Sequence, residues 1–179
     1  MKSVLISTRP EWVEKIVNGE KTIEVRKSAP KEVPFKAYIY CTKEKKQDDI
    51  IWAGAFGDRG KWNGHIIGEF ICDKIDDYAY DYCDGVDIDD DTILETAIER
   101  EDINIYAKGK ILYGWHISDL KIYDKPKELS EFWGRKNCIA AATVECWNCF
   151  ATCLEIEGKP YQPLTRPPQS WQYVEELEK

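Results

Sequence analysis

Hydrophobic and polar positions near the start of the chain follow the spacing of a strand and then of a helix. The run Val4-Leu5-Ile6 predicts a short strand. Between residues 12 and 17 the apolar side chains recur at i and i+4, as on a helix with one buried face. Thr8-Arg9-Pro10-Glu11 has the form of a capping box with proline in the first turn, and Gly19 is a favourable helix stop.

Polar and apolar residues then alternate from residue 22 to residue 26, which predicts a second strand. Side chains alternate between the two faces of a strand, so Ile23 and Val25 should face the core. Thr22, Glu24 and Arg26 should share the opposite face.

Later apolar runs predict the remaining elements. Strands are expected at residues 37–41, 66–72, 111–117 and 120–123, and short helices from residue 92 towards 100 and from residue 126 to 132. Gly68 suggests a bulge or tight bend, and the polar segment 43–63 a surface loop. Short strands with few helices, no repeat and no Gly/Ser linker predict an α+β fold. We expect a small mixed β-barrel over residues 1–179, not a doubly wound sheet.

The net charge of −8 is unevenly distributed. Residues 73–102 carry a balance of −11, residues 1–72 one of +3, and residues 103–179 are balanced. An acidic chain can therefore still contain a local anion-binding cleft. Residues 84–91 lack the ligand order of an EF-hand, which favours a solvated acidic face over a calcium site. Such a face could engage a basic protein partner.

The chain contains no run of about 20 apolar residues, the length that would cross a bilayer. Arg9-Pro10 follows the first strand at once, so the apolar run of a signal peptide is missing. We therefore expect a cytoplasmic, reducing environment. The seven cysteines are then better interpreted as thiols or metal ligands than as disulfides.

Four of the cysteines, Cys138, Cys146, Cys149 and Cys153, lie close together in the sequence. One Cys-x-x-Cys pair with two further thiols nearby can form a tetrahedral zinc site. The alternative is a set of small buried thiols in a helix, because alanines at 140–142 give the region helical character. The spacing leaves both interpretations open. No cofactor is otherwise required.

The polar segment from Gly19 to Arg26 is the most informative for function. Lys21 and Arg26 offer donors to a phosphate or a base carbonyl, and Glu24 can accept from an exocyclic amine. These groups could orient a polar planar ligand. The alternative is a surface salt-bridge ladder, which contributes little stability.

Gly19, Lys21, Glu24 and Arg26 form the run G-x-K-x-x-E-x-R. It is accompanied by the first strand, a helix with Trp12 and Ile16, and a late strand Trp115-His116-Ile117. Together they resemble the ASCH family of the PUA-like β-barrel superfold. The closing run Leu164-Thr165-Arg166-Pro167-Pro168-Gln169-Ser170-Trp171 resembles a bacterial and prophage branch of that family. Within this resemblance, 73–102 is an acidic insertion and 138–179 a Cys/Pro-rich extension.

The resemblance implies a cleft that binds RNA or recognises a nucleobase or its modified form. The residues expected to bind the ligand are Lys21, Glu24, Arg26, Arg166, Gln169 and Trp171. Aromatic rings on which bases stack are typical of proteins that bind single strands. Trp171 is the expected ring because its neighbours are polar and it follows a Pro-Pro pair, whereas Tyr38, Tyr40 and Trp115 are expected in the core.

The resemblance also implies a catalytic alternative. Small family members are amidohydrolases that act on acylated cytidine with a lysine, a threonine and a glutamate. Lys21 matches the lysine, but Glu24 stands where those enzymes have the threonine. A catalytic Lys21 would need a lowered pKa, which burial beside Arg26 would favour and Glu24 would oppose.

Three functions follow as hypotheses. The first is a binding module for RNA or a modified nucleobase. The second is a hydrolase, an amidohydrolase or ribonuclease, that uses Lys21 and Glu24. The third is a prophage interaction protein that acts through its acidic face. His65 and His116 are each expected to stand alone and to be structural.

The zinc interpretation of the four clustered cysteines predicts about one zinc ion per chain. The measurement is metal analysis of protein purified without chelator and without added zinc. A chain free of zinc would assign the four thiols to the protein interior instead.

Overall fold

A computed structural model describes residues 1–43, 62–135, 154–156 and 159–175. The clustered cysteines and most of the segment 43–63 lie outside these residues, so both interpretations of the cysteines stay predictions. Within the described ranges no three His, Cys, Asp or Glu side chains are grouped as metal ligands would be. None of the helices described has the length and apolar content that a membrane crossing requires.

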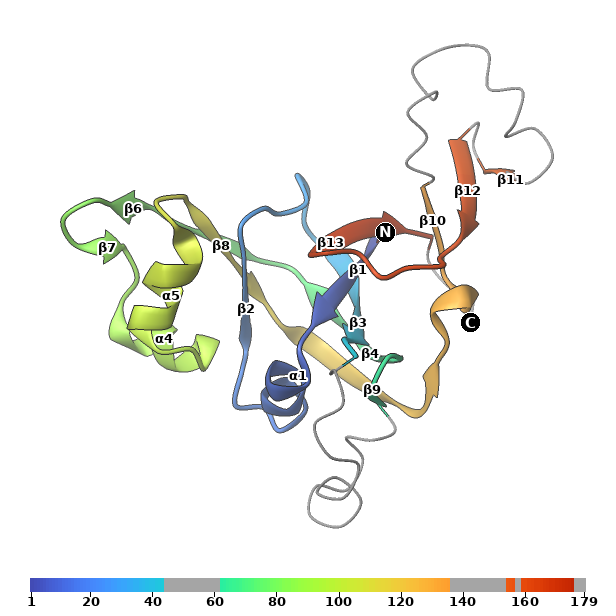
Figure 1. The fold of residues 1–179 in the computed structure, drawn as a ribbon, viewed down its shortest axis with the longest axis horizontal. Coiled ribbons are helices and arrows are strands. Elements are labelled where there is room, and N and C mark those ends of the chain that lie inside the picture. The colour runs from blue at the N-terminus through green and yellow to red at the C-terminus, as the bar shows by residue number, and fades with distance from the viewer. Residues whose placement is uncertain (44–61, 136–153, 157–158, 176–179) are drawn as a thin grey trace.

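The larger sheet has eight strands in the order β11-β12-β10-β13-β1-β3-β4-β9 (Figure 1). In chain order they are β1 (Lys2–Thr8), β3 (Phe35–Cys41), β4 (Ile66–Cys72), β9 (Ser118–Lys127), β10 (Trp133–Arg135), β11 (Leu154–Ile156), β12 (Lys159–Pro163) and β13 (Trp171–Val174). The pairing of β1 with β3 is parallel, and every other pairing in this sheet is antiparallel.

Two smaller sheets and three helices complete the described fold. One sheet has the order β2 (Ile23–Arg26), β8 (Leu112–His116) and β5 (Ile75–Tyr78), and β6 (Tyr80–Asp81) pairs with β7 (Gly85–Val86). The helices are α1 (Pro10–Val17), α4 (Asp90–Thr96) and α5 (Arg100–Ala107), with a 3-10 turn η1 (Leu129–Glu131). The α+β prediction is therefore confirmed.

The N-terminal elements follow their sequence pattern with one exception. Val13 and Ile16 of α1 are buried in the main core against β1 and β3, and Gly19 ends the helix with a positive φ of 75°. The predicted capping box is wrong, since α1 begins after Arg9 with no side-chain cap. Thr8 belongs to β1, where its hydroxyl accepts a hydrogen bond from a distant arginine.

The predicted barrel is not closed. The chain passes from the large sheet to the small one between β4 and β5, and returns between β8 and β9. The edge of β1 opposite β3 is taken by β13, while β2 pairs with β8 instead. Among the described strands no ladder joins β2 to β1 or β13, so a gap separates the two sheets there.

The acidic segment is an ordered lobe at one side of the molecule (Figure 1). Apolar residues of this lobe, including Ile88 and Ile103, form a core of their own with Val25 of β2. The single helix expected from residue 92 is two helices, because Asp89 caps α4 and Ala97 adopts a left-handed conformation that ends it. The acidic side chains face the solvent.

The prediction of a helix over residues 126–132 is also wrong. Pro126 lies in β9, an edge strand, where a missing N–H is tolerated. Only the single turn η1 follows it.

The close packing of β4 at Gly68 can be tested by substitution. The register of β4 shifts at this residue, which confirms the predicted bulge. A Cβ at Gly68 would collide with the backbone carbonyl oxygen of Lys121. We expect Gly68→Ala to lower the free energy of unfolding by about 3 kcal/mol, because a backbone atom cannot move aside cheaply.

The matched control is Gly19→Ala, measured in the same urea titration. A Cβ at Gly19 has no neighbour within 4 Å, so only the positive φ opposes it. That strain costs about 1 kcal/mol. Equal losses in the two variants would contradict the crowding at Gly68.

Candidate ligand-binding site

Three charged side chains fill the gap between β2 and the strands β1 and β13. Lys21, Glu24 and Arg26 are 1%, 6% and 7% exposed. Ile23 and Val25 lie in the core as predicted, so β2 is buried on both faces. The alternative of a surface salt-bridge ladder is therefore wrong. These three residues are called the charged cluster below.

The guanidinium of Arg26 bridges the gap. Its Nη2 lies 2.7 Å from Oε1 of Glu24 and donates to the carbonyl oxygen of Ser7 at 2.9 Å and to the hydroxyl of Thr8 at 3.3 Å. Its Nη1 donates to the carbonyl oxygen of Ser170 at 3.3 Å. The side chain thus ties β2 to β1 and to the residue before β13, where no backbone ladder exists.

One donor of Arg26 has no acceptor. Its Nε is buried and unpaired in the described structure. Buried polar groups are nearly always hydrogen-bonded, so an unpaired donor needs an explanation. One such explanation is that a ligand supplies the acceptor for this N–H group.

Lys21 is held from the side of the acidic lobe. Its Nζ donates to the carbonyl oxygen of Thr96, the last residue of α4, at 2.7 Å and lies 3.4 Å from Oε2 of Glu24. Burial is the main cause that lowers the pKa of Lys21; Glu24 opposes this and Arg26 adds to it. The lowered pKa is the condition that a catalytic lysine would need. The ammonium is nevertheless enclosed by α4.

The charged cluster carries one net positive charge when all three groups are ionised. Glu24 is the anion between two buried cations and contacts both. A buried cation without a partner is costly. The carboxylate therefore holds the cluster together, and the excess positive charge favours an anionic ligand.

An open hollow of about 640 Å³ lies at the end of β3, and none of the three residues of the charged cluster lines it. The parallel strands β1 and β3 end together at its rim, where the amide of Thr42 donates to the carbonyl oxygen of Thr8 at 2.9 Å. Thr8 therefore connects the hollow with Arg26. The residues that line it are Tyr40, Thr42, Lys43, Gly64, Glu128, Leu129, Ser130, Leu164, Thr165 and Pro167.

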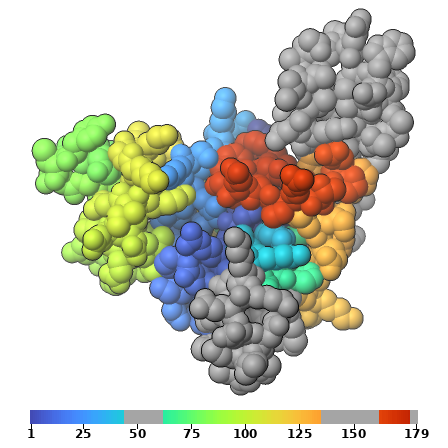
Figure 2. Space-filling model, viewed as in Figure 1, coloured from blue at the N-terminus to red at the C-terminus, as the bar shows by residue number. Residues whose placement is uncertain are grey.

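The closing run lies against the same edge of β1. Ser7 donates its hydroxyl to the carbonyl oxygen of Pro168 at 2.6 Å and its amide to that of Ser170 at 2.9 Å. Figure 2 shows this run and β13, in red, bordering the N-terminal elements, in blue. Arg166 and Gln169 are exposed, so their side chains are accessible to a ligand.

Trp171 is anchored. Its indole N–H donates to the carbonyl oxygen and hydroxyl of Ser28 at 3.1 and 3.0 Å, and its ring packs edge-on against Trp115. The indole is half-buried, so its ring is only partly accessible. Tyr38, Tyr40 and Trp115 are buried, which confirms that they belong to the core.

Sequence reasoning missed the groups that hold the cluster in place. The acceptors from Ser7, Thr96 and Ser170 are backbone carbonyls, and no residue type marks a carbonyl in a sequence.

Both histidines have partners, contrary to expectation. Nε2 of His116 lies 2.6 Å from Asp76, and Nε2 of His65 lies 3.1 Å from Glu128.

Two neutralising substitutions test the charge balance of the cluster. Glu24→Gln leaves two buried cations side by side, and we expect a loss of about 3–5 kcal/mol in the free energy of unfolding. Lys21→Met is the matched control, since it leaves the neutral pair of Glu24 and Arg26 and should cost less. Chemical denaturation measures both. A Lys21→Met variant less stable than Glu24→Gln would contradict the conclusion that Glu24 compensates the charges of two buried cations.

Comparisons with known proteins identify the fold. No family model matches the chain, and no curated protein is similar to it in sequence. The crystal structure of ASCH from Zymomonas mobilis matches with a TM-score of 0.54 and 16% identity, covering 98% of this chain and 89% of that one. Two variants of that protein, one with a tyrosine replaced by phenylalanine and one with a serine replaced by alanine, both match with a TM-score of 0.53 and 16% identity. They too cover 98% of this chain, and the matches span 92% and 89% of theirs. The chain has the ASCH fold.

Proposed function

We propose that the protein binds single-stranded RNA at the edge where β1 and β3 end, with one nucleotide, ordinary or modified, in the hollow of about 640 Å³ that Thr8 connects with the charged cluster. The observation that carries the proposal is the buried guanidinium of Arg26, whose Nε–H has no acceptor in the described structure. The ASCH fold supports the same choice, because the family resemblance implies RNA or nucleobase binding.

The electrostatics of the cluster favour a phosphate or a base carbonyl as the missing acceptor. A guanidinium in a poorly solvated site forms short, charge-assisted hydrogen bonds with such oxygens. Glu24 fixes the orientation of Arg26, and Lys21 fixes Glu24. We therefore assign the direct contact to Arg26, with Lys21 and Glu24 as positioning residues.

The hollow has the size and chemistry that a nucleotide requires. At about 640 Å³ it falls within the range of small-molecule sites. Thr42, Ser130 and Thr165 offer polar groups, and the exposed Lys43 offers a cation at the rim. Arg166, also exposed, extends the positive surface along the closing run.

Binding is a better account of this site than hydrolysis. The lowered pKa of Lys21 suits a nucleophile or base. Its ammonium, however, is engaged by Thr96 and Glu24, and its side chain is 1% exposed. A substrate would have to displace the end of α4 to reach it. A protein partner for the acidic face stays a prediction.

The test is a fluorescence titration with short single-stranded RNA and DNA at about 50 mM and about 200 mM salt. We expect salt-sensitive RNA binding by the wild type. Arg26→Lys should weaken it at least about tenfold, because lysine keeps the charge but lacks the Nε–H and the planar fork. The matched control, Arg100→Lys in the acidic lobe, should bind like the wild type. Thermal unfolding checks that both variants fold.

A second variant keeps the proposal testable if Arg26→Lys fails to fold. Lys43→Gln at the exposed rim should reduce the slope of log K against log salt by about 1, because one phosphate contact is lost. The proposal is wrong if the wild type binds no RNA at the lower salt. It is also wrong if RNA binding is unaffected by Lys43→Gln and by a folded Arg26→Lys.

A further inference from the structure

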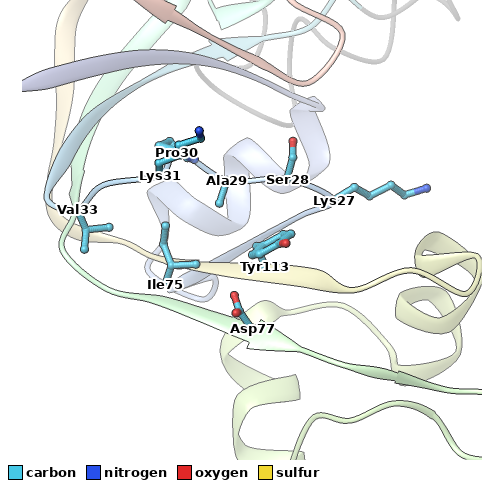
Figure 3. Close-up of a pocket in the computed structure, with 9 residues that line it drawn as sticks. All are labelled: Lys27, Ser28, Ala29, Pro30, Lys31, Val33, Ile75, Asp77 and Tyr113. Atoms are coloured by element: carbon cyan, nitrogen blue, oxygen red, sulfur yellow. The ribbon is translucent and has the colours of Figure 1, made fainter.

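A second hollow, of about 460 Å³, lies under the loop that follows β2 (Figure 3). Lys27, Lys31 and Val33 of the loop line it, together with Ile75 and Asp77 of β5 and Tyr113 of β8. It shares no lining residue with the hollow of about 640 Å³. The hollow is therefore distinct from the site described above.

The charges around this hollow are available to a ligand. Lys27, Lys31 and Asp77 are exposed, and none of them forms an ion pair among the residues that the structure describes. The Nζ of Lys27 lies 4.6 Å from the centre of the Tyr106 ring, a contact that leaves its charge without a counterion. In Figure 3 the Lys27 side chain extends away from the other lining residues, so Lys31 supplies the cation and Asp77 the anion beside the open space.

The anionic and cationic groups lie on different sides of this hollow. Asp77 and Tyr113 are register partners in the β5–β8 ladder, so the carboxylate lies beside the phenol ring. In Figure 3 the two lie on one side of the hollow and Lys31 lies on the other, with Ile75 between them. A fitting ligand has a planar part against Tyr113 and Ile75, a hydrogen-bond donor for Asp77 and an anionic group for Lys31.

A nucleotide whose base carries an exocyclic amine has these three features. Carboxylates accept from base amines, and lysines bind phosphates as point charges. The loop of the hollow also adjoins the proposed RNA site, since Ser28 lies two residues after Arg26 and accepts the indole N–H of Trp171.

We propose that this hollow is a second nucleotide subsite, which selects an amine-bearing base through Asp77 and holds the phosphate with Lys31. The choice of a nucleotide as the ligand rests on the proposed function. The protein would then bind two nucleotides of one strand, one in each hollow.

The test uses the whole chain and two mononucleotides that differ at one base position. Adenosine monophosphate offers an amine to Asp77, and inosine monophosphate offers a carbonyl oxygen there. The readout is the NMR signal of the Trp171 indole N–H, assigned with Trp171→Phe, because this group contacts Ser28 at the wall of the hollow. We expect adenosine monophosphate to shift this signal and to bind at least about tenfold more tightly than inosine monophosphate.

Two variants of exposed residues dissect the recognition. Asp77→Asn should reduce the preference to less than about threefold, because an amide can donate to the inosine carbonyl as well as accept from an amine. Lys31→Gln should weaken adenosine monophosphate about tenfold and leave adenosine unchanged, since only the phosphate contact is lost. In the described structure the side chains of Asp77 and Lys31 form no hydrogen bonds, so neither substitution removes one from the folded protein.

The outcomes separate this inference from the proposed function. An unshifted Trp171 signal, equal binding of the two mononucleotides, or a preference that Asp77→Asn preserves would overturn the subsite even if RNA binds through Arg26. An Asp77-dependent preference in a protein that binds no RNA would establish the subsite and refute the proposed function instead.

Discussion

The fold depends on one side chain that replaces a missing β-ladder. The eight-stranded sheet and the sheet of β2, β8 and β5 share no backbone pairing between β2 and β1 among the described residues. Arg26 spans this gap with hydrogen bonds to Ser7, Thr8 and Ser170. A flexible surface pair would give little stability, but a buried guanidinium with several fixed acceptors is strongly constrained. This bridge holds the end of β1 in a fixed position relative to β2.

The acidic lobe has a structural role that its charge alone does not suggest. Its helix α4 ends against Lys21, and the carbonyl oxygen of Thr96 receives the ammonium. The negative end of a helix is a favourable place for a cation. The lobe thereby closes the cluster on the side of Lys21. On the other side, Arg26 connects the cluster with β1 and with the closing run through Ser7, Thr8 and Ser170.

Local pattern was sufficient for much of the fold. β1, α1, β3 and β4 were predicted because apolar periodicity and Gly19 act within a few residues. The grouping of Lys21, Glu24 and Arg26 followed from strand alternation after a helix stop. Their burial did not, because it is produced by Thr96 and Ser170, which lie far away in sequence. The predicted capping box was wrong for the same reason, because Thr8 belongs to β1 and its hydroxyl accepts a hydrogen bond from Arg26.

The pairing of β1 with β13 has a consequence for how the protein is made. Ser7 and Pro168, which share a hydrogen bond, are 161 positions apart. Contacts of such long range form slowly, and an unpaired strand edge invites association with other chains. During translation β1 leaves the ribosome long before residues 171–174, so one edge of the sheet stays bare in the nascent chain. Synthesis speed and chaperone access at that stage then influence the yield of folded protein, because the edge formed by β1 and β13 is assembled late.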